Sequence, residues 1–147
     1  MSQDTIRKPD NTAHLISKTR RLINEYLVHE MEEAGIHGFV PSHGDIICTL
    51  FKHPQITMTK LAKAIQRDRS TVTTLVKKLQ QFGYVLLQEN PKDTRSRLVS
   101  LTDKGRKLKD EFHPISVRLT QSIWQGISKE DRMQFRSILD KIIQNFS

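Results

Sequence analysis

In the middle of this chain, the spacing of apolar residues changes from the period of helices to that of strands. Residues 41–52 repeat apolar side chains at helical spacing and begin with proline, which suits the first turn of a helix. Two more short helices are predicted over residues 57–65 and 70–82, whose first residues, a threonine and a serine, are the expected caps. A polar turn at 66–69 separates them, and Gly83 stands at the left-handed stop position. This order predicts a helix-turn-helix.

The segment that follows has the composition of a β-hairpin. Residues 84–88 and 97–101 are β-prone, and the Asn-Pro-Lys-Asp sequence at 90–93 is typical of a turn. The hairpin tip, residues 92–97, holds Lys92, Arg95 and Arg97. A helix-turn-helix followed by a two-stranded basic hairpin predicts a winged helix-turn-helix in a mainly α (α+β) chain.

Amphipathic helices flank this segment on both sides. Residues 11–33 form one apolar stripe at helical spacing. Thr102 is expected to cap another helix, which Pro114 either kinks or leaves continuous, and Ser128 is expected to cap the last. We therefore expect a helical domain built from residues 10–36 and 105–147, and a winged domain over residues 40–104.

The positive charge of the chain is confined to its middle. The net charge is +8, and residues 55–110 alone carry 13 basic and 5 acidic residues. The two flanking segments are close to neutral. A basic excess gathered in one contiguous segment indicates a polyanionic partner, with a merely solvated basic surface as the alternative.

Other features of the sequence exclude several classes of protein. The single cysteine, Cys48, rules out an intramolecular disulfide framework and a CxxC motif. No run approaches the ~20 apolar residues that a membrane span needs. The N-terminal residues lack the apolar core of a secretory signal. We expect a cytoplasmic protein with no membrane partner.

The predicted third helix presents an outer face without carboxylates. Its outer positions, which carry hydroxyl, methyl and ammonium groups, are Ser70, Thr71, Thr73, Thr74, Lys77 and Lys78. These groups suit phosphates and base edges in a major groove, whereas an ordinary polar face would be acidic at roughly one position in four. Arg67 and Arg69 are expected in the preceding turn, within reach of phosphates.

The hairpin tip is the second candidate for contact with DNA. Arginines on a narrow two-stranded loop suit the minor groove, where the negative potential is strongest when the groove is narrow. Asp93 is expected to pair with Arg95 or Arg97 and to set its direction. A solvated hairpin tip is the alternative.

Two motifs stand at a fixed distance in this segment. One is Asp68-Arg69-Ser70-Thr71-Val72-Thr73, followed by Gly83-Tyr84-Val85. The other is Asp93-Thr94-Arg95-Ser96-Arg97, followed by Leu101-Thr102-Asp103-Lys104-Gly105. Together they resemble the MarR family of bacterial winged helix-turn-helix transcriptional regulators, over about residues 40–110. Leu87 departs from that pattern, because members often carry an arginine there.

The resemblance implies an intertwined homodimer that binds a pseudo-palindromic operator in double-stranded DNA, as a repressor relieved by a small molecule. It places the outer face of the third helix in the major groove. Arg95 would enter the minor groove, oriented by Asp93 and supported by Arg97. A small aromatic or phenolic effector would bind where the dimerisation helices meet the winged domain.

Cysteine and histidine residues offer weaker candidates. Cys48 lies among Ile46, Ile47 and Leu50, so we expect a buried packing residue and not a sensor. No two histidines stand four positions apart, so the sequence contains no local metal motif. Zinc held by His43 and His113 from separate helices stays open through the resemblance. No cofactor is expected.

Two other functions compete with the regulator. A nucleic-acid-processing enzyme would need clustered carboxylates for Mg²⁺, but Asp68, Asp93 and Asp103 are isolated in the sequence. A winged protein-interaction module without specific DNA binding is the other alternative, and an acidic outer face would have favoured it.

Overall fold

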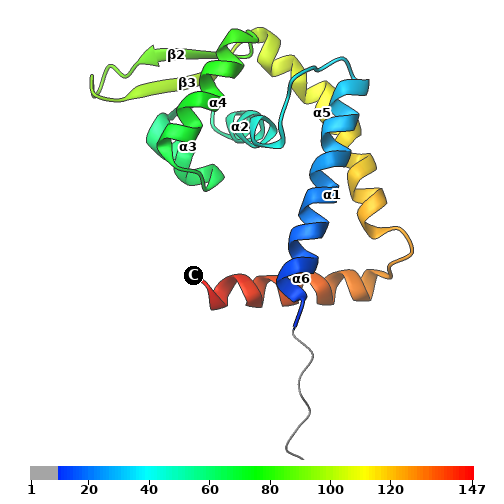
Figure 1. Cartoon of the computed structure of the whole chain (residues 1–147). Coiled ribbons are helices and arrows are strands. Elements are labelled where there is room, and N and C mark those ends of the chain that lie inside the picture. Colours follow the sequence, from blue (N-terminus) through cyan, green and yellow to red (C-terminus); the bar gives the residue numbers. More distant parts are fainter. Residues whose placement is uncertain (1–9) are drawn as a thin grey trace, which may run out of the picture.

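The computed structural model describes residues 10–147, and part of the segment on which the signal-peptide prediction rests lies outside that range. The helices and strands follow one another as α1 (Thr12–Glu33), α2 (Pro41–Lys52), β1 (Gln55–Thr57), α3 (Met58–Ile65), α4 (Arg69–Gln81), β2 (Val85–Glu89), β3 (Arg97–Leu101), α5 (Asp103–Trp124) and α6 (Lys129–Asn145). The predicted winged helix-turn-helix is confirmed. In Figure 1 it forms one end of the molecule, and α1 and α5 lead away from it toward α6.

Side-chain caps fix where several helices begin. Thr57, Thr102 and Ser128 each accept a hydrogen bond from a main-chain N–H three residues on, as expected. The expected cap of the third helix is wrong: Asp68 caps α4, and Ser70 lies inside its first turn. A carboxylate oxygen of Asp68 accepts the N–H of Thr71 at 2.7 Å. Arg69 is consequently the first residue of α4 and not part of the turn.

The sheet has three strands, one more than the predicted hairpin. Its order is β1-β3-β2, and both pairings are antiparallel. In β1, Ile56 lies opposite Val99, so the start of α3 is joined to the hairpin through the backbone. The hairpin and the helix-turn-helix are thus one unit.

The core lies beneath α4 and the sheet. Its fully buried side chains are Ile46, Ile47, Leu50, Leu61, Leu79, Val72, Val76, Val85 and Val99. The long helices add Met31 from α1 and Leu108, Phe112 and Ile115 from α5. Only the near ends of these long helices therefore contribute to the core of the winged unit.

Two hydrogen bonds and one close packing contact form the junction that holds the start of α5 against the winged unit. The Thr102 hydroxyl donates to the carbonyl of Gly83 at 2.6 Å, and Lys104 Nζ donates to the carbonyl of Phe82 at 2.8 Å. A Cβ on Gly105 would lie 2.1 Å from the carbonyl oxygen of Tyr84, so only glycine fits. Beyond this junction α5 continues through Pro114 without ending.

The far ends of the long helices leave their apolar side chains uncovered. No residue of α6 is buried, and Met133 and Ile143 expose 64% and 60% of their surface. Leu15 and Ile16 of α1 are exposed too.

Arg118 of α5 and Glu30 of α1 form an ion pair at 2.6 Å between the two helices. Over residues 10–147, no helix has the length and apolar character that crossing a membrane requires.

Candidate nucleic-acid interface

The outer side of α4 is the first part of the site, and we call its six predicted contact residues the recognition face. Val72, Val76 and Leu79 are fully buried on the opposite side of the helix. The recognition face consists of exposed Ser70, Thr71, Thr74, Lys77 and Lys78, with Thr73 half-buried. The helical period therefore predicted correctly which residues face outward.

Every hydroxyl group of the recognition face already donates a hydrogen bond within the chain. Ser70 and Thr71 donate to the Asp68 carboxylate at 2.8 and 2.9 Å. Thr73 and Thr74 donate to main-chain carbonyls one turn earlier, at 2.8 and 3.2 Å. What these side chains offer outward is oxygen lone pairs and threonine methyl groups. Such groups match the amino groups of adenine and cytosine and the methyl group of thymine.

Asp68 is a candidate site residue that the sequence prediction did not include, because it caps α4 beside the recognition face. Hydrogen bonds hold the pKa of its carboxyl group below the ordinary value, first from the Thr71 N–H and then from the Ser70 and Thr71 hydroxyls. The charged carboxylate thus orients the first turn of the recognition face. Aspartate and serine are equally good caps, so their residue types could not decide between Asp68 and Ser70.

Two arginines stand just before and at the start of α4, and two lysines lie in its second half. Arg67 follows the left-handed Gln66, and its guanidinium donates to the Ser42 hydroxyl at 3.4 Å. Arg69 is exposed at the start of the helix. Lys78 lies with Nζ 5.4 Å from the centre of the Phe82 ring, so it leans toward the end of α4. For Lys77, the other lysine in the second half of the helix, the structure of residues 10–147 shows no ion pair and no such ring contact.

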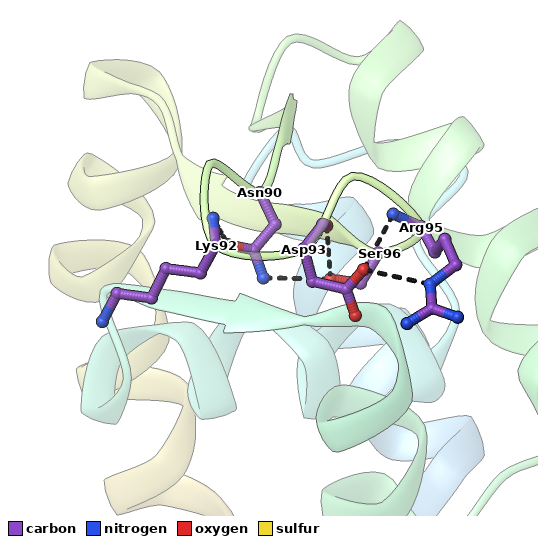
Figure 2. Close-up of polar contacts among 5 residues, drawn as sticks. All are labelled: Asn90, Lys92, Asp93, Arg95 and Ser96. Carbon is purple, nitrogen blue, oxygen red and sulfur yellow. Dashed lines mark hydrogen bonds and ion pairs between the residues drawn. The ribbon is translucent and has the colours of Figure 1, made fainter.

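The loop between β2 and β3, residues 90–96, is the wing loop, and Figure 2 shows its polar contacts. Asn90 Nδ2 donates to the Ser96 hydroxyl at 2.9 Å and closes the base of the loop. Asp93 accepts the main-chain N–H of Arg95 at 3.0 Å and its side-chain Nε at 3.4 Å. The expected pairing of Asp93 with an arginine is therefore present, with Arg95. The wing loop is an organised turn.

Arg95 and Arg97 occupy different settings. The Arg95 side chain is 91% exposed, so it is free to reach a partner from the tip of the wing loop. Arg97 is the first residue of β3 and lies opposite Glu89 of β2. Beside α4, the hairpin carries the wing loop outward from the helical core (Figure 1).

The expectation that Cys48 is a buried packing residue is wrong. Cys48 is exposed, because the buried side of α2 is formed by His43, Ile46, Ile47 and Leu50. Part of the residue is nevertheless desolvated where it lines a cavity, and this desolvation and then the Asp45 charge raise the pKa of its thiol, which disfavours the reactive thiolate. His43 is buried, and its Nδ1 accepts the Val40 N–H at 3.0 Å. Within the described residues, no three potential metal ligands gather.

A small cavity lies between α1, α2 and α5, apart from the recognition face. Its volume is about 160 Å³, and its walls are mainly apolar. Leu27 and Met31 line it from α1, and Phe112 and Ile115 from α5. Cys48 and Asp45 of α2 contribute polar atoms.

Comparison with known proteins gives likenesses over most of the chain. The chain is 22% identical over 140 residues to the HTH-type transcriptional regulator YkoM of Bacillus subtilis, covering 95% of this chain and 89% of that protein. It is 31% identical over 98 residues to the organic hydroperoxide resistance transcriptional regulator of Bacillus subtilis, covering 65% and 63%.

The structure is also similar to solved structures of transcriptional regulators. A mutant MarR from E. coli, solved in complex with operator DNA, superposes with a TM-score of 0.84 at 19% identity, over 95% of this chain and 99% of that one. Residues 41–96 match the model of the MarR family. The helix-turn-helix and wing of this chain therefore match the MarR family, and the fold of the whole chain is like that of a solved MarR protein.

Proposed function

We propose that this protein is a dimeric, sequence-specific DNA-binding transcriptional regulator that acts as a repressor. The observation that carries the proposal is the recognition face, whose six residues include no carboxylate, with a basic wing loop beside it. Arg67 and Arg69 stand at the start of α4, where Ser70 and Thr71 hold the one neighbouring carboxylate, that of Asp68. The recognition face enters the major groove, with Arg67 and Arg69 on phosphates. Family members with regulator names, and a relative solved on operator DNA, support this proposal.

The wing loop supplies the minor-groove contact in this proposal. Arg95 enters the groove, because its side chain is almost fully exposed at the loop tip. Asp93 limits the conformations of the loop through two hydrogen bonds to Arg95. Arg97 supports the loop from the start of β3.

The protein acts as a homodimer on a pseudo-palindromic operator. Residues 10–36 and 105–147 form the dimerisation domain, and residues 40–104 form the DNA-binding domain. This assignment is supported by α6, whose apolar side chains find no cover in their own chain over residues 10–147. A second copy that buries them would also pair two recognition faces with two operator half-sites.

A small aromatic or phenolic effector relieves repression in this proposal. The cavity between α1, α2 and α5 supports it, because its mainly apolar walls and volume of about 160 Å³ suit a single-ring molecule. It lies where the two proposed domains meet, so a bound molecule could change the position of α4 relative to the dimerisation helices.

A salt titration of DNA binding tests the proposed function. Lys77→Ala should weaken binding to mixed-sequence duplex DNA and lower the salt dependence of log K by roughly 0.9 for each phosphate that the variant no longer neutralises. Lys78→Ala should have the smaller effect, because Lys78 leans on Phe82. Fluorescence anisotropy at several salt concentrations measures both, with exposed Lys129→Ala of α6 as control. Wild-type affinity and slope in both α4 variants would contradict this docking.

A further inference from the structure

A second basic surface lies on the other side of the wing loop from Arg95. It is an open groove of about 740 Å³ between the wing loop and the β1–α3 segment. We call it the lysine groove. Its lining residues are His53, Gln55, Ile56, Thr57, Lys60, Lys63, Ala64, Asn90, Pro91, Lys92 and Leu98. None of these described residues is acidic.

Lysines from both walls converge on this groove. Lys60 and Lys63 lie one turn apart on α3 and are exposed. Lys92 comes from the wing loop, and Figure 2 shows that it points to the opposite side of the loop from Arg95. The β1–β3 pairing fixes the separation of the two walls, since Thr57 at the start of α3 lies opposite Leu98.

The three lysines are not neutralised within the described part of the chain. Among residues 10–147, none of them takes part in an ion pair. By contrast, Arg95 has Asp93, and Arg106 of α5 has Asp103. Three like charges facing one groove repel one another, and an anionic partner lying between the walls would remove that repulsion.

We propose that the lysine groove binds the sugar-phosphate backbone of the DNA that borders the minor groove entered by Arg95. The inference rests on the proposed function, because it uses Arg95 to place the duplex. With Arg95 in the narrow minor groove, Lys92 on the other side of the same loop meets the strand that borders it. Lys60 and Lys63 then hold that strand from α3. The groove contributes affinity and a longer DNA site, but no base reading.

Paired double variants test the groove in the full-length protein. The Lys60→Ala/Lys63→Ala double variant should bind mixed-sequence duplex DNA roughly five- to tenfold more weakly for each lysine–phosphate pair removed, near 0.1 M salt. Its salt slope should fall by roughly 0.9 for each such pair. Lys92→Ala should show the same change for one lysine. All three side chains are exposed, so circular dichroism should report an unchanged fold.

The matched control is Lys107→Ala/Lys109→Ala, which removes the same charge from exposed positions of α5 outside the groove. A lower slope in the groove variant than in this control supports the inference. Equal slopes in the two double variants overturn it, while the proposed function stands if Lys77→Ala still lowers the slope. Absence of DNA binding by the wild-type protein overturns both.

Discussion

The winged unit and the far ends of the long helices are both made of amphipathic segments, yet they bury their apolar faces differently. In the winged unit Ile46, Val72 and Val99 are fully inaccessible to solvent. In α6, Phe135 and Ile138 have similar spacing and hydrophobicity but expose 49% and 54% of their surface. The difference shows that amphipathicity alone does not say whether a helix completes a core within its own chain.

The two regions differ in the source of their stability, which is burial within one chain for the winged unit and burial against another surface for α6. Burying one large aliphatic side chain contributes about 1.5–3 kcal/mol. The winged unit gains this contribution within one chain, whereas α6 can gain it only against another surface. If these sources are separate, damage to α6, to the contact of Gly105 with Tyr84 that we call the seam, and to the wing loop should have different effects on stability and on DNA binding.

Removing α6 should have the largest effect. A chain that ends after Ser128 loses the apolar stripe of Met133, Phe135, Ile138 and Ile143. In a dimer, this loss amounts to on the order of 10 kcal/mol or more of burial, counted over both chains. The truncated protein should be insoluble or unfolded. Solubility and sedimentation velocity measure this, and a well-folded soluble monomer would contradict the dimerisation assignment.

The second largest effect is expected from adding a methyl group at Gly105. Gly105→Ala places a Cβ 2.1 Å from the main-chain oxygen of Tyr84, so the start of α5 must move. We expect a loss of about 3 kcal/mol in the free energy of unfolding. Gly44→Ala in α2 is the control, because its Cβ would meet no atom within 4 Å and should stabilise the helix by about 0.5–1 kcal/mol. Urea unfolding compares the two, and equal midpoints would disprove the close packing at the seam.

Changes in the wing loop should affect binding and leave the core stable. Arg95→Ala should cost on the order of 1–3 kcal/mol of specific DNA binding. Asp93→Ala should also weaken binding, because it frees the loop that Asp93 organises. Net charge alone predicts tighter binding for this variant, so the two explanations differ in sign. Operator affinity at fixed salt decides, and tighter binding by Asp93→Ala would show that Asp93 is only a surface charge.

The smallest effect concerns His43, a buried residue of α2 whose ring packs against Phe82 at the end of α4. Desolvation and then the Lys78 charge lower the pKa of His43 below its ordinary value of 6.5. The unfolded chain therefore binds more protons at acidic pH, so the contribution of neutral His43 is present above pH 6.5 and is lost as the pH falls below it.

The His43→Gln variant tests this assignment. Glutamine keeps an acceptor for the Val40 N–H but does not titrate. The stability of the variant should fall less than that of the wild type between neutral and acidic pH. Urea unfolding at several pH values measures the difference. Parallel profiles for the two proteins would show that other groups carry the pH dependence.

Local signals predicted most of the helix-turn-helix and the composition of its outer face. Thr57 and Thr102 marked helix starts because each has one obvious role as a cap. The cap of α4 was mispredicted because Asp68 and Ser70 are competing candidates, and in the fold Ser70 donates its hydroxyl to Asp68. Cys48 was mispredicted because an apolar neighbourhood in the sequence surrounds every side of a helix, while only one side faces the core.

The sequence by itself determined the order of helices and strands, the confinement of positive charge and the polar outer side of α4, since these depend on residues within a turn or two of each other. Only the tertiary structure decided that β1 joins the sheet, that Gly105 lies against Tyr84, and that Lys92 and Arg95 point to opposite sides of the wing loop. Each of these depends on how separate segments pack or on how one loop folds back on itself. No local preference encodes the first two, because their free energy arises only when the segments meet. The third follows from the turn that the Asn90 and Asp93 side chains hold through hydrogen bonds to the main chain.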